Sequence, residues 1–178
     1  LGTDMLPALA LGAEPPDREL MQRPPRPAGE RLLAWPVLRR AYLWLGVLQA
    51  AAALGAFFFV LNAGGWQYGE ALAPRDPLYL QATTACLAAI VLAQVANIFS
   101  CRDALRSAFR IPLRANPLLL QAVALEILLL GLIVFTPVGQ AAFGTAPPPL
   151  AAWPIMVALA VCFGLLEELR KAVLRSRT

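Results

Sequence analysis

The amino-terminal stretch Leu1-Gly-Thr-Asp-Met-Leu-Pro-Ala-Leu-Ala-Leu-Gly12 places a polar pair and a proline in an apolar run. If it is helical and lies in a membrane, Pro7 offers no N–H to the carbonyl of Thr3, four residues earlier. That carbonyl must find another partner in lipid. The Thr3 hydroxyl, the Asp4 carboxylate and the freed carbonyl then lie within one helical turn, and hard cations bind such sets of oxygens. The alternative is that Asp4 only caps a helix that begins at Met5.

The composition is typical of a chain with several membrane-spanning segments. Of the 178 residues, 59% are hydrophobic and 15% are charged, and the mean hydropathy is +0.63. A soluble domain carries about a quarter charged residues. Because the charges here are confined to blocks between long apolar runs, we expect a polytopic all-α membrane protein. The net charge of +4 therefore does not indicate nucleic-acid binding, and no nucleic-acid partner is expected.

The apolar runs predict a bundle of four complete transmembrane helices plus an amino-terminal half-helix. A helix needs about 20 residues to cross the hydrocarbon layer, and each run reaches that length or approaches it with its flanking residues. We divide the chain into the half-helix at 1–12, a proline-rich link at 13–40, and the four-helix bundle with a short tail at 41–178. The expected spans are Ala41–Asn62, Leu78–Phe99, Pro117–Thr136 and Pro154–Leu166.

The basic residues predict how these spans are oriented. Every Lys and Arg except Arg75 falls in the link, between the second and third spans, or after the fourth span. Cytoplasmic loops carry such an excess of basic residues. We therefore expect the link and the carboxy-terminal tail in the cytoplasm, with the lipid bilayer surrounding the spans between them.

Two groups of charged residues lie on that expected cytoplasmic side. Arginines recur every four residues from Arg102 to Arg114, through Arg106 and Arg110, which predicts a short amphipathic helix resting on anionic headgroups. The tail begins with an acidic pair, Glu167-Glu168, followed by basic residues. We expect these glutamates to form ion pairs at the membrane interface.

Three polar side chains within the spans are candidate ligands. Gln94 and Asn97 lie three residues apart on one face of the second span, where amides must meet partners on other helices. Glu126 lies in the middle of the third span, which is apolar enough to insert although a central acid costs about 3 kcal/mol. We expect this acid to face the bundle. The alternatives are that the amides only hold helices together, and that Glu126 is protonated and bonded to a neighbouring backbone.

The scarcity of soft ligands restricts the metals that this chain could bind. Histidine is absent, and Cys86, Cys101 and Cys162 are not spaced as Cys-x-x-Cys. Neither a disulfide framework nor a zinc or copper site is therefore expected. Oxygen ligands and hard ions remain.

The first dozen residues, with Pro15-Pro16-Asp17, Met21 and Pro24-Pro25-Arg26 after them, resemble the sixth membrane helix of P-type cation-transporting ATPases and the link that follows it. The nearest branches are calcium pumps and sodium/potassium pumps. This resemblance implies that Thr3 and Asp4 are cation ligands. It also implies that Gln94 and Asn97 contribute to cation binding, and that Glu126 serves a cation site or a proton path.

The resemblance further implies that the chain begins inside the sixth helix and continues through helices seven to ten of a pump. The family's phosphorylated Asp-Lys-Thr-Gly-Thr and a phosphate-cradling glycine-rich loop are both absent from this sequence, so ATP, Mg²⁺ and phosphorylation are expected in another part of the parent. The expected partners are that part's helices and cytosolic domains, together with inorganic cations, Ca²⁺ or Na⁺/K⁺. The plasma membrane is the expected location.

Two other classes of function remain open from the residues alone. One is a small secondary transporter or channel that uses Asp4 and Glu126 without ATP coupling. The other is a structural membrane subunit whose polar residues only pack helices.

Overall fold

The computed structural model describes residues 2–15 and 33–176, and for residues 2–4 it describes the backbone alone. The described residues are mainly helical and contain no β-strand, which confirms the all-α prediction. Most of the link, at 16–32, lies outside the described residues. The main helices are α1 (Gly2–Gly12), α2 (Trp35–Leu38), the π-helical η2 (Arg39–Gly46), α3 (Val47–Ala63), α4 (Pro77–Cys101), α5 (Pro117–Phe135), α6 (Pro137–Phe143) and α7 (Ala152–Arg175).

Four helices in the described residues are long and apolar enough to cross a membrane. The first is continuous through α2, η2 and α3, and the others are α4, α5 and α7. Their lengths run from 19 to 29 residues, which matches the thickness of the hydrocarbon layer. The four complete spans expected from hydropathy are therefore confirmed.

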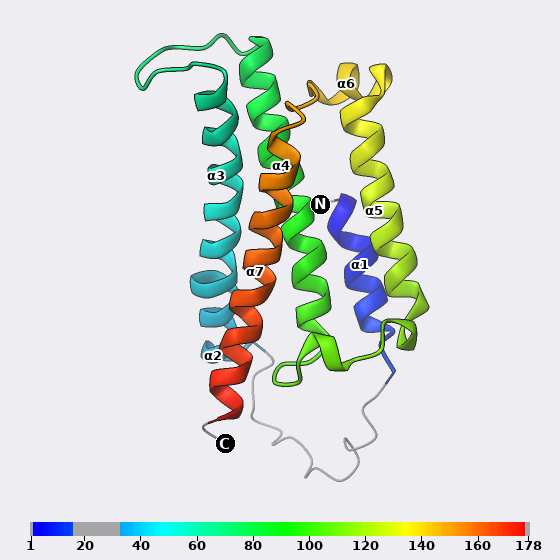
Figure 1. Ribbon diagram of the computed structural model, residues 1–178. Coiled ribbons are helices and arrows are strands. Elements are labelled where there is room, and N and C mark those ends of the chain that lie inside the picture. Colours follow the sequence, from blue (N-terminus) through cyan, green and yellow to red (C-terminus); the bar gives the residue numbers. More distant parts are fainter. Residues whose placement is uncertain (1, 16–32, 177–178) are drawn as a thin grey trace.

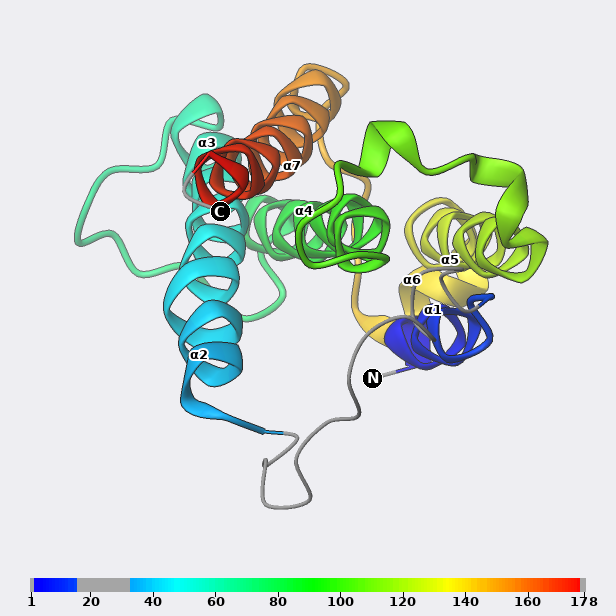
Figure 2. The same cartoon turned by 90° about the horizontal axis from the view of Figure 1, so that it is seen from below.

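Helix α4 occupies the centre of the bundle. It contacts α3 and α7 on one side, and α5 and α1 on the other. Figure 2 shows this arrangement end-on, with α1 and α5 forming a pair apart from α3 and α7. Helix α1 reaches only about halfway up the bundle, from the end where α7 terminates (Figure 1). We call that end, where the 102–116 segment also lies, the basic end.

Small residues allow α4 to pack closely against its neighbours. Ala82, Ala85, Ala88 and Ala89 are all at most 1% exposed and form one cluster with residues of α3, α5 and α7. In lipid, close approach of helix backbones replaces the hydrophobic effect as the source of attraction between helices. The alanine stripe therefore fixes α4 as the central helix.

Three of the helices begin with a capping residue followed by proline. The side chains of Asp76, Asn116 and Thr136 each accept a backbone N–H at the start of α4, α5 and α6 respectively. Each cap satisfies one of the N–H groups that the first turn leaves unpaired, and proline at the next position has no N–H to satisfy. The helix starts at 77, 117 and 137 are therefore encoded locally.

The first and last spans extend further at the basic end than hydropathy predicts. The first begins at Trp35 instead of Ala41, and the last continues through Arg175 instead of ending at Leu166. Both extensions contain charged residues, which lower the hydropathy. An ion pair between Arg40 and Glu167 joins the two extensions.

The predicted amphipathic helix between α4 and α5 is wrong. The segment contains two short 3₁₀ turns, Ala108–Arg110 and Leu113–Ala115, separated by Ile111 and Pro112. The Asp103 carboxylate accepts the backbone N–H groups of Leu105 and Arg106 and forms a turn directly after α4. Arg102 points inward and is almost fully buried, so the arginines do not form a common lipid-facing row.

Candidate cation-binding site

Helices α1, α4 and α5 meet in a small apolar cluster near the basic end. Its members are Ala10 of α1, Ile98 of α4, and Leu119 and Ala122 of α5, each at most 8% exposed. This cluster identifies the face that each helix turns toward the other two. Residues three or four positions further along the same faces lie one turn deeper in the bundle.

One helical turn further from the basic end, two of these three faces carry polar side chains. Gln94 lies four residues before Ile98 on α4, and Glu126 lies four residues after Ala122 on α5. Glu126 is only 1% exposed. The Oε1 atom of Gln94 is buried and has no hydrogen-bond partner among residues 2–15 and 33–176. The structure thus places Gln94 and Glu126 on the converging faces of adjacent helices.

The third helix turns a buried proline toward the bundle. Pro7 is buried within α1, three residues before Ala10. It leaves the carbonyl of Thr3 without its usual intrahelical donor. The backbone of Thr3 and Asp4 belongs to the first turn of α1, but their side chains lie outside the described residues, so their role as ligands stays a prediction.

Asn97 is half-buried on α4, three residues from Gln94. Its Oδ1 atom lies 3.4 Å from the Sγ atom of Cys101, one turn nearer the basic end. A thiol is a weak donor, so this contact leaves the amide oxygen available to a stronger partner. The role of Asn97 also stays a prediction.

The oxygens at this position suit hard cations. Amide, carboxylate and free carbonyl oxygens are the donors that Ca²⁺ and similar ions take. Within the described residues no group of three or more His, Cys, Asp or Glu comes together. The three cysteines are free.

A second polar cluster lies where α1 ends, and sequence reasoning missed it. We call Glu14, Arg102 and Asn116 the α1–α5 node. Arg102 donates through Nε to Glu14 at 2.9 Å, and Asn116 donates through Nδ2 to the other carboxylate oxygen at 2.7 Å. Burial raises the pKa of Glu14, but the hydrogen bonds from Arg102 and Asn116 and the charge of Arg102 outweigh it and leave the pKa below its ordinary value.

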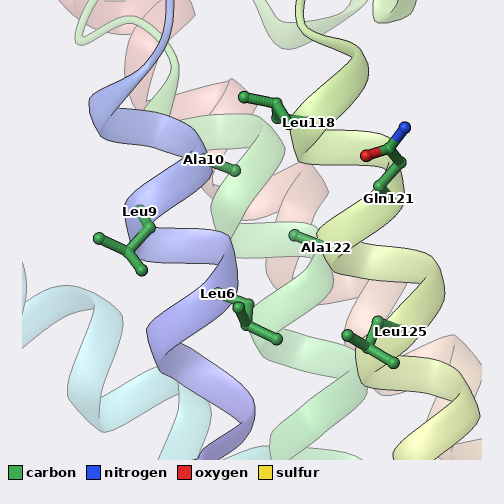
Figure 3. Close-up of a pocket in the computed structure, with 7 residues that line it drawn as sticks. All are labelled: Leu6, Leu9, Ala10, Leu118, Gln121, Ala122 and Leu125. Carbon is green, nitrogen blue, oxygen red and sulfur yellow. The ribbon is translucent and has the colours of Figure 1, made fainter.

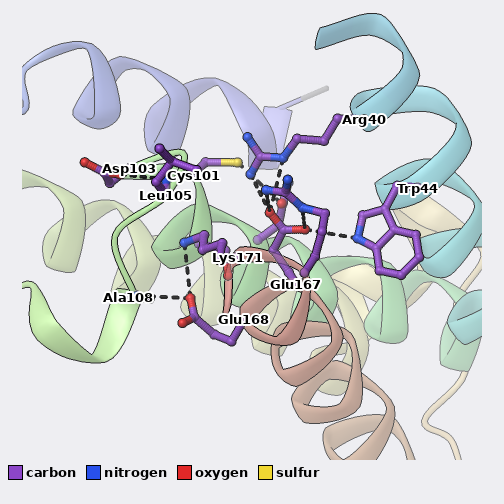
Figure 4. A network of polar contacts seen from close by, with 12 residues as sticks. Arg40, Trp44, Cys101, Asp103, Leu105, Ala108, Glu167, Glu168 and Lys171 are labelled. Atoms are coloured by element: carbon purple, nitrogen blue, oxygen red, sulfur yellow. Dashed lines mark hydrogen bonds and ion pairs between the residues drawn. The ribbon is translucent and has the colours of Figure 1, made fainter. Parts of the chain in front are cut away.

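The glutamates at the end of α7 form ion pairs, as predicted. Glu167 is completely buried and accepts hydrogen bonds from Arg40 at 2.6 Å, Arg170 at 2.7 Å and the Trp44 indole at 3.0 Å. Arg40 and Trp44 both lie on the π-helical η2. Figure 4 shows this group joining the first and last spans at the basic end.

The neighbouring Glu168 connects α7 to the 102–116 segment. It accepts the backbone N–H of Ala108 at 3.0 Å and pairs with Lys171 at 3.1 Å. Lys171 is fully buried and also donates to the carbonyl of Arg106. These contacts, also drawn in Figure 4, hold the segment between α4 and α5 against the end of α7.

Helices α1 and α5 also border a groove of about 300 Å³. Figure 3 shows its wall, with Ala10 level with the start of α5 and Leu6 nearer Leu125. The two helices therefore run antiparallel along it. Its lining is apolar except for one amide: Leu6, Leu9, Ala10, Leu118, Gln121, Ala122 and Leu125.

Comparison with known families gives this arrangement its context. The family described as "Cation transporting ATPase, C-terminus" matches residues 1–173. The chain belongs to this cation-transporting ATPase family. The resemblance inferred from the first 26 residues is therefore confirmed over almost the whole sequence, and the chain corresponds to the carboxy-terminal membrane region of P-type ATPases.

Relatives in the cation-transporting ATPase family come from two branches. The chain is 27% identical over 200 residues to a sodium/potassium-transporting ATPase subunit alpha of Drosophila melanogaster, covering 98% of this chain and 19% of that protein. It is 32% identical over 163 residues to a calcium-transporting ATPase of Bacillus subtilis, covering 89% and 16% respectively. An endoplasmic reticulum calcium ATPase of Aspergillus fumigatus is 29% identical over 190 residues, covering 96% and 20%. The chain thus spans about a fifth of the length of these relatives.

Proposed function

We propose that this chain is the membrane part of an ATP-driven cation pump and supplies side chains that bind the transported ion. The observation that carries the proposal is the convergence of α1, α4 and α5. Glu126 is buried, and the buried Gln94 oxygen has no hydrogen-bond partner among the described residues. These two groups and the proline-interrupted turn of α1 lie on the three faces that meet. A membrane interior tolerates an acid and an amide at such a place mainly when they serve transport or pair with each other.

Asp4 and Thr3 are proposed as the core ligands. They precede buried Pro7 by three and four residues, so helical spacing assigns both positions to the face of α1 that carries Pro7 and Ala10. The carbonyl of Thr3, released by Pro7, adds a third oxygen. Gln94, Asn97 and Glu126 would complete the shell or conduct a proton.

We favour Ca²⁺ as the transported ion, with Na⁺/K⁺ as the alternative. The sequence Ala-Leu-Gly followed by Pro15-Pro16-Asp17 favours the calcium branch, whereas Gly2-Thr-Asp-Met5 favours the sodium/potassium branch. The two sets of relatives support both choices. ATP and Mg²⁺ would act in the cytosolic domains of the parent, which also supplies the remaining helices as partners.

The basic end is proposed to face the cytoplasm of a plasma membrane. The support is the segregation of Lys and Arg, since only Arg75 lies in the loop at the other end. Single cysteines introduced in sealed vesicles test this orientation. A cysteine at Ser176 should be shielded from an external impermeant thiol reagent, and one at the fully exposed Tyr68 should react. The opposite pattern would reverse the topology.

ATP-dependent ion uptake by vesicles containing the full-length pump tests the function. We expect Ca²⁺ uptake that needs ATP, that Asp4→Asn abolishes, and that Gln94→Ala weakens. Gln121→Ala is the matched control, because Gln121 is an exposed amide on α5 outside the converging faces. Uptake of Na⁺ but not Ca²⁺ would show that the transported ion is the alternative, Na⁺. Uptake without ATP would favour a secondary transporter, and no uptake of either ion would favour a structural subunit.

A further inference from the structure

The α1–α5 node is built more elaborately than a helix cap requires. Asn116 accepts the N–H of Leu119 through Oδ1 at 3.1 Å, which caps α5. Its Nδ2 group points the other way and donates to the carbonyl of Ala10 at 2.8 Å and to Glu14 at 2.7 Å. Capping needs only an acceptor oxygen, which serine or aspartate also provides. The amide is the group that caps α5 and binds α1 at once.

Two of the three side chains of the node are well shielded. Asn116 is 2% exposed and the side chain of Arg102 is 1% exposed, whereas that of Glu14 is 21% exposed. Arg102 holds Glu14 and also donates through Nη1 to the carbonyl of Pro112 at 3.2 Å. Hydrogen bonds to charged groups in such surroundings are directional and stronger than those between neutral groups. The end of α1 is therefore fixed to the start of α5 by oriented bonds.

Among the side chains that the structure describes, the other contacts between α1 and α5 in this part of the bundle are apolar. They involve Ala10, Leu119 and Ala122, and beside them lies the groove of Figure 3. Apolar contacts are not directional. A slip by one helical turn would move the two helices by about 5.4 Å, which exceeds the tolerance of a cation site.

The node fixes how α1 lies along α5, and this alignment also determines where the candidate ligands lie relative to each other. Along the groove, Ala10 lies opposite the first turns of α5, and Leu6 lies nearer Leu125 (Figure 3). The two helices run antiparallel, so moving back along α1 corresponds to moving forward along α5. Moving back from Leu6 leads to Thr3 and Asp4, and moving forward from Ala122 past Leu125 leads to Glu126, so both lie on the same side of this contact, away from the basic end.

We propose that Glu14, Arg102 and Asn116 are positioning residues that set the depth of α1 against α5 and so align its ligand turn with Glu126. The inference rests on the proposed cation site and adds three residues that do not touch the ion. Their effect is on how tightly the cation binds, because they determine where the ligands lie relative to each other.

The test uses the full-length pump with Asn116→Ser, which keeps an acceptor to cap α5 and loses both donations to α1. We expect the cation concentration for half-maximal phosphorylation by ATP to rise about tenfold, while the maximal phosphorylation level is retained. Glu14→Gln should also raise the cation concentration for half-maximal phosphorylation. Asp76→Ser is the matched control, since it makes the same kind of exchange at the cap of α4, at the other end of the bundle.

A cross-linking measurement reports the register without relying on ion binding. In a cysteine-depleted pump, a pair of cysteines at Leu6 and Leu125 should form a disulfide, and Asn116→Ser should slow its formation severalfold. The control is a pair at Gly55 of α3 and Leu159 of α7, where a Cβ on Gly55 would lie 3.8 Å from Leu159 Cδ1, and its cross-linking should be unaffected.

Both changes together support the proposal. If Asn116→Ser leaves cross-linking and half-saturation unchanged, or alters only one of them, the node does not align the ligands and the proposal is overturned. A wild-type pump that binds no cation would instead contradict the proposed function, and the cross-linking result would then still report whether the node sets the register.

Discussion

Glu167 joins the first and last spans at a single buried carboxylate. Its side chain is fully buried, whereas those of Arg40 and Arg170 are about a quarter and a fifth exposed. The Glu167 carboxylate accepts hydrogen bonds from both arginines and from the Trp44 indole. Removing it leaves two partly buried cations without their acceptor.

We expect Glu167→Ala to lower the free energy of unfolding by about 3 kcal/mol for this reason. Loss of helical circular dichroism on heating the purified pump in detergent measures the effect. Glu70→Ala is the control, since Glu70 is exposed in the loop before α4 and its loss should change stability by less than about 0.5 kcal/mol. Equal losses in the two variants would contradict a special role for Glu167.

Glu14 gives the stability of the node a defined pH dependence. Its pKa is below the ordinary value of 4.5 in the folded protein, so its contribution is fully present above that value. The contribution is lost as pH falls from 4.5 through the lower, folded pKa. The stability difference between wild type and Glu14→Gln, measured by unfolding against pH, should therefore be constant from pH 6 to 8 and shrink below about pH 4.5. A difference that grows on acidification would refute this pairing.

Which residues form polar contacts was only partly predictable from sequence. Glu167 and Glu168 were recognisable because some of their partners, Arg170 and Lys171, lie one helical turn away. Glu14 falls in the proline-rich link, and its partners Arg102 and Asn116 are 88 and 102 residues away along the chain. Local charge patterns cannot indicate such pairs, since only the packing of α1 against α4 and α5 creates them.

Two glycines, one in α5 and one in α6, should respond in opposite ways to substitution by alanine. A Cβ on Gly139 would collide with the Leu132 carbonyl and come within 2.7 Å of the Ile133 backbone. A Cβ on Gly131 would meet nothing within 4 Å. The turn from α5 into α6 thus depends on Gly139, and the helix before it does not depend on Gly131.

We expect Gly139→Ala to destabilise the protein by about 1–3 kcal/mol, because backbone atoms cannot yield as side chains do. Gly131→Ala should be neutral or stabilising by up to about 1 kcal/mol, since alanine favours helix. Thermal unfolding of the two variants side by side measures the difference. A Gly139→Ala protein as stable as Gly131→Ala would contradict the close approach of α6 to α5.

Hydropathy predicted the number and the order of the spans, but not where the outer two end. Apolar length determines which segments cross the membrane, and the caps Asp76, Asn116 and Thr136 mark three helix starts in the sequence itself. The extensions to Trp35 and Arg175 contain charged residues that lower the hydropathy, and one pair of them, Arg40 and Glu167, joins two helices that are distant in the sequence. The repeat of arginines from Arg102 to Arg114 suggested a helix that does not form, since Arg102 pairs with Glu14.

At the scale of the whole molecule, the bundle has two unequal sides. Helices α3, α4 and α7 pack through a continuous small-residue core, and α1 packs with α5 and the far side of α4 (Figure 2). The candidate ligands lie on the second side. The sequence alone could nominate Gln94 and Glu126 by their polarity, but only the packing shows that their helix faces converge.

Equilibrium cation binding to the purified full-length pump tests the central claim most directly, because it needs neither ATP nor transport. The account predicts that Glu126→Gln and Gln94→Ala each weaken Ca²⁺ or Na⁺ binding at least about tenfold, as loss of a buried ligand should. Gln121→Ala should bind as wild type does. Wild-type affinity in both ligand variants, with the proteins still folded, would contradict a cation site between α1, α4 and α5.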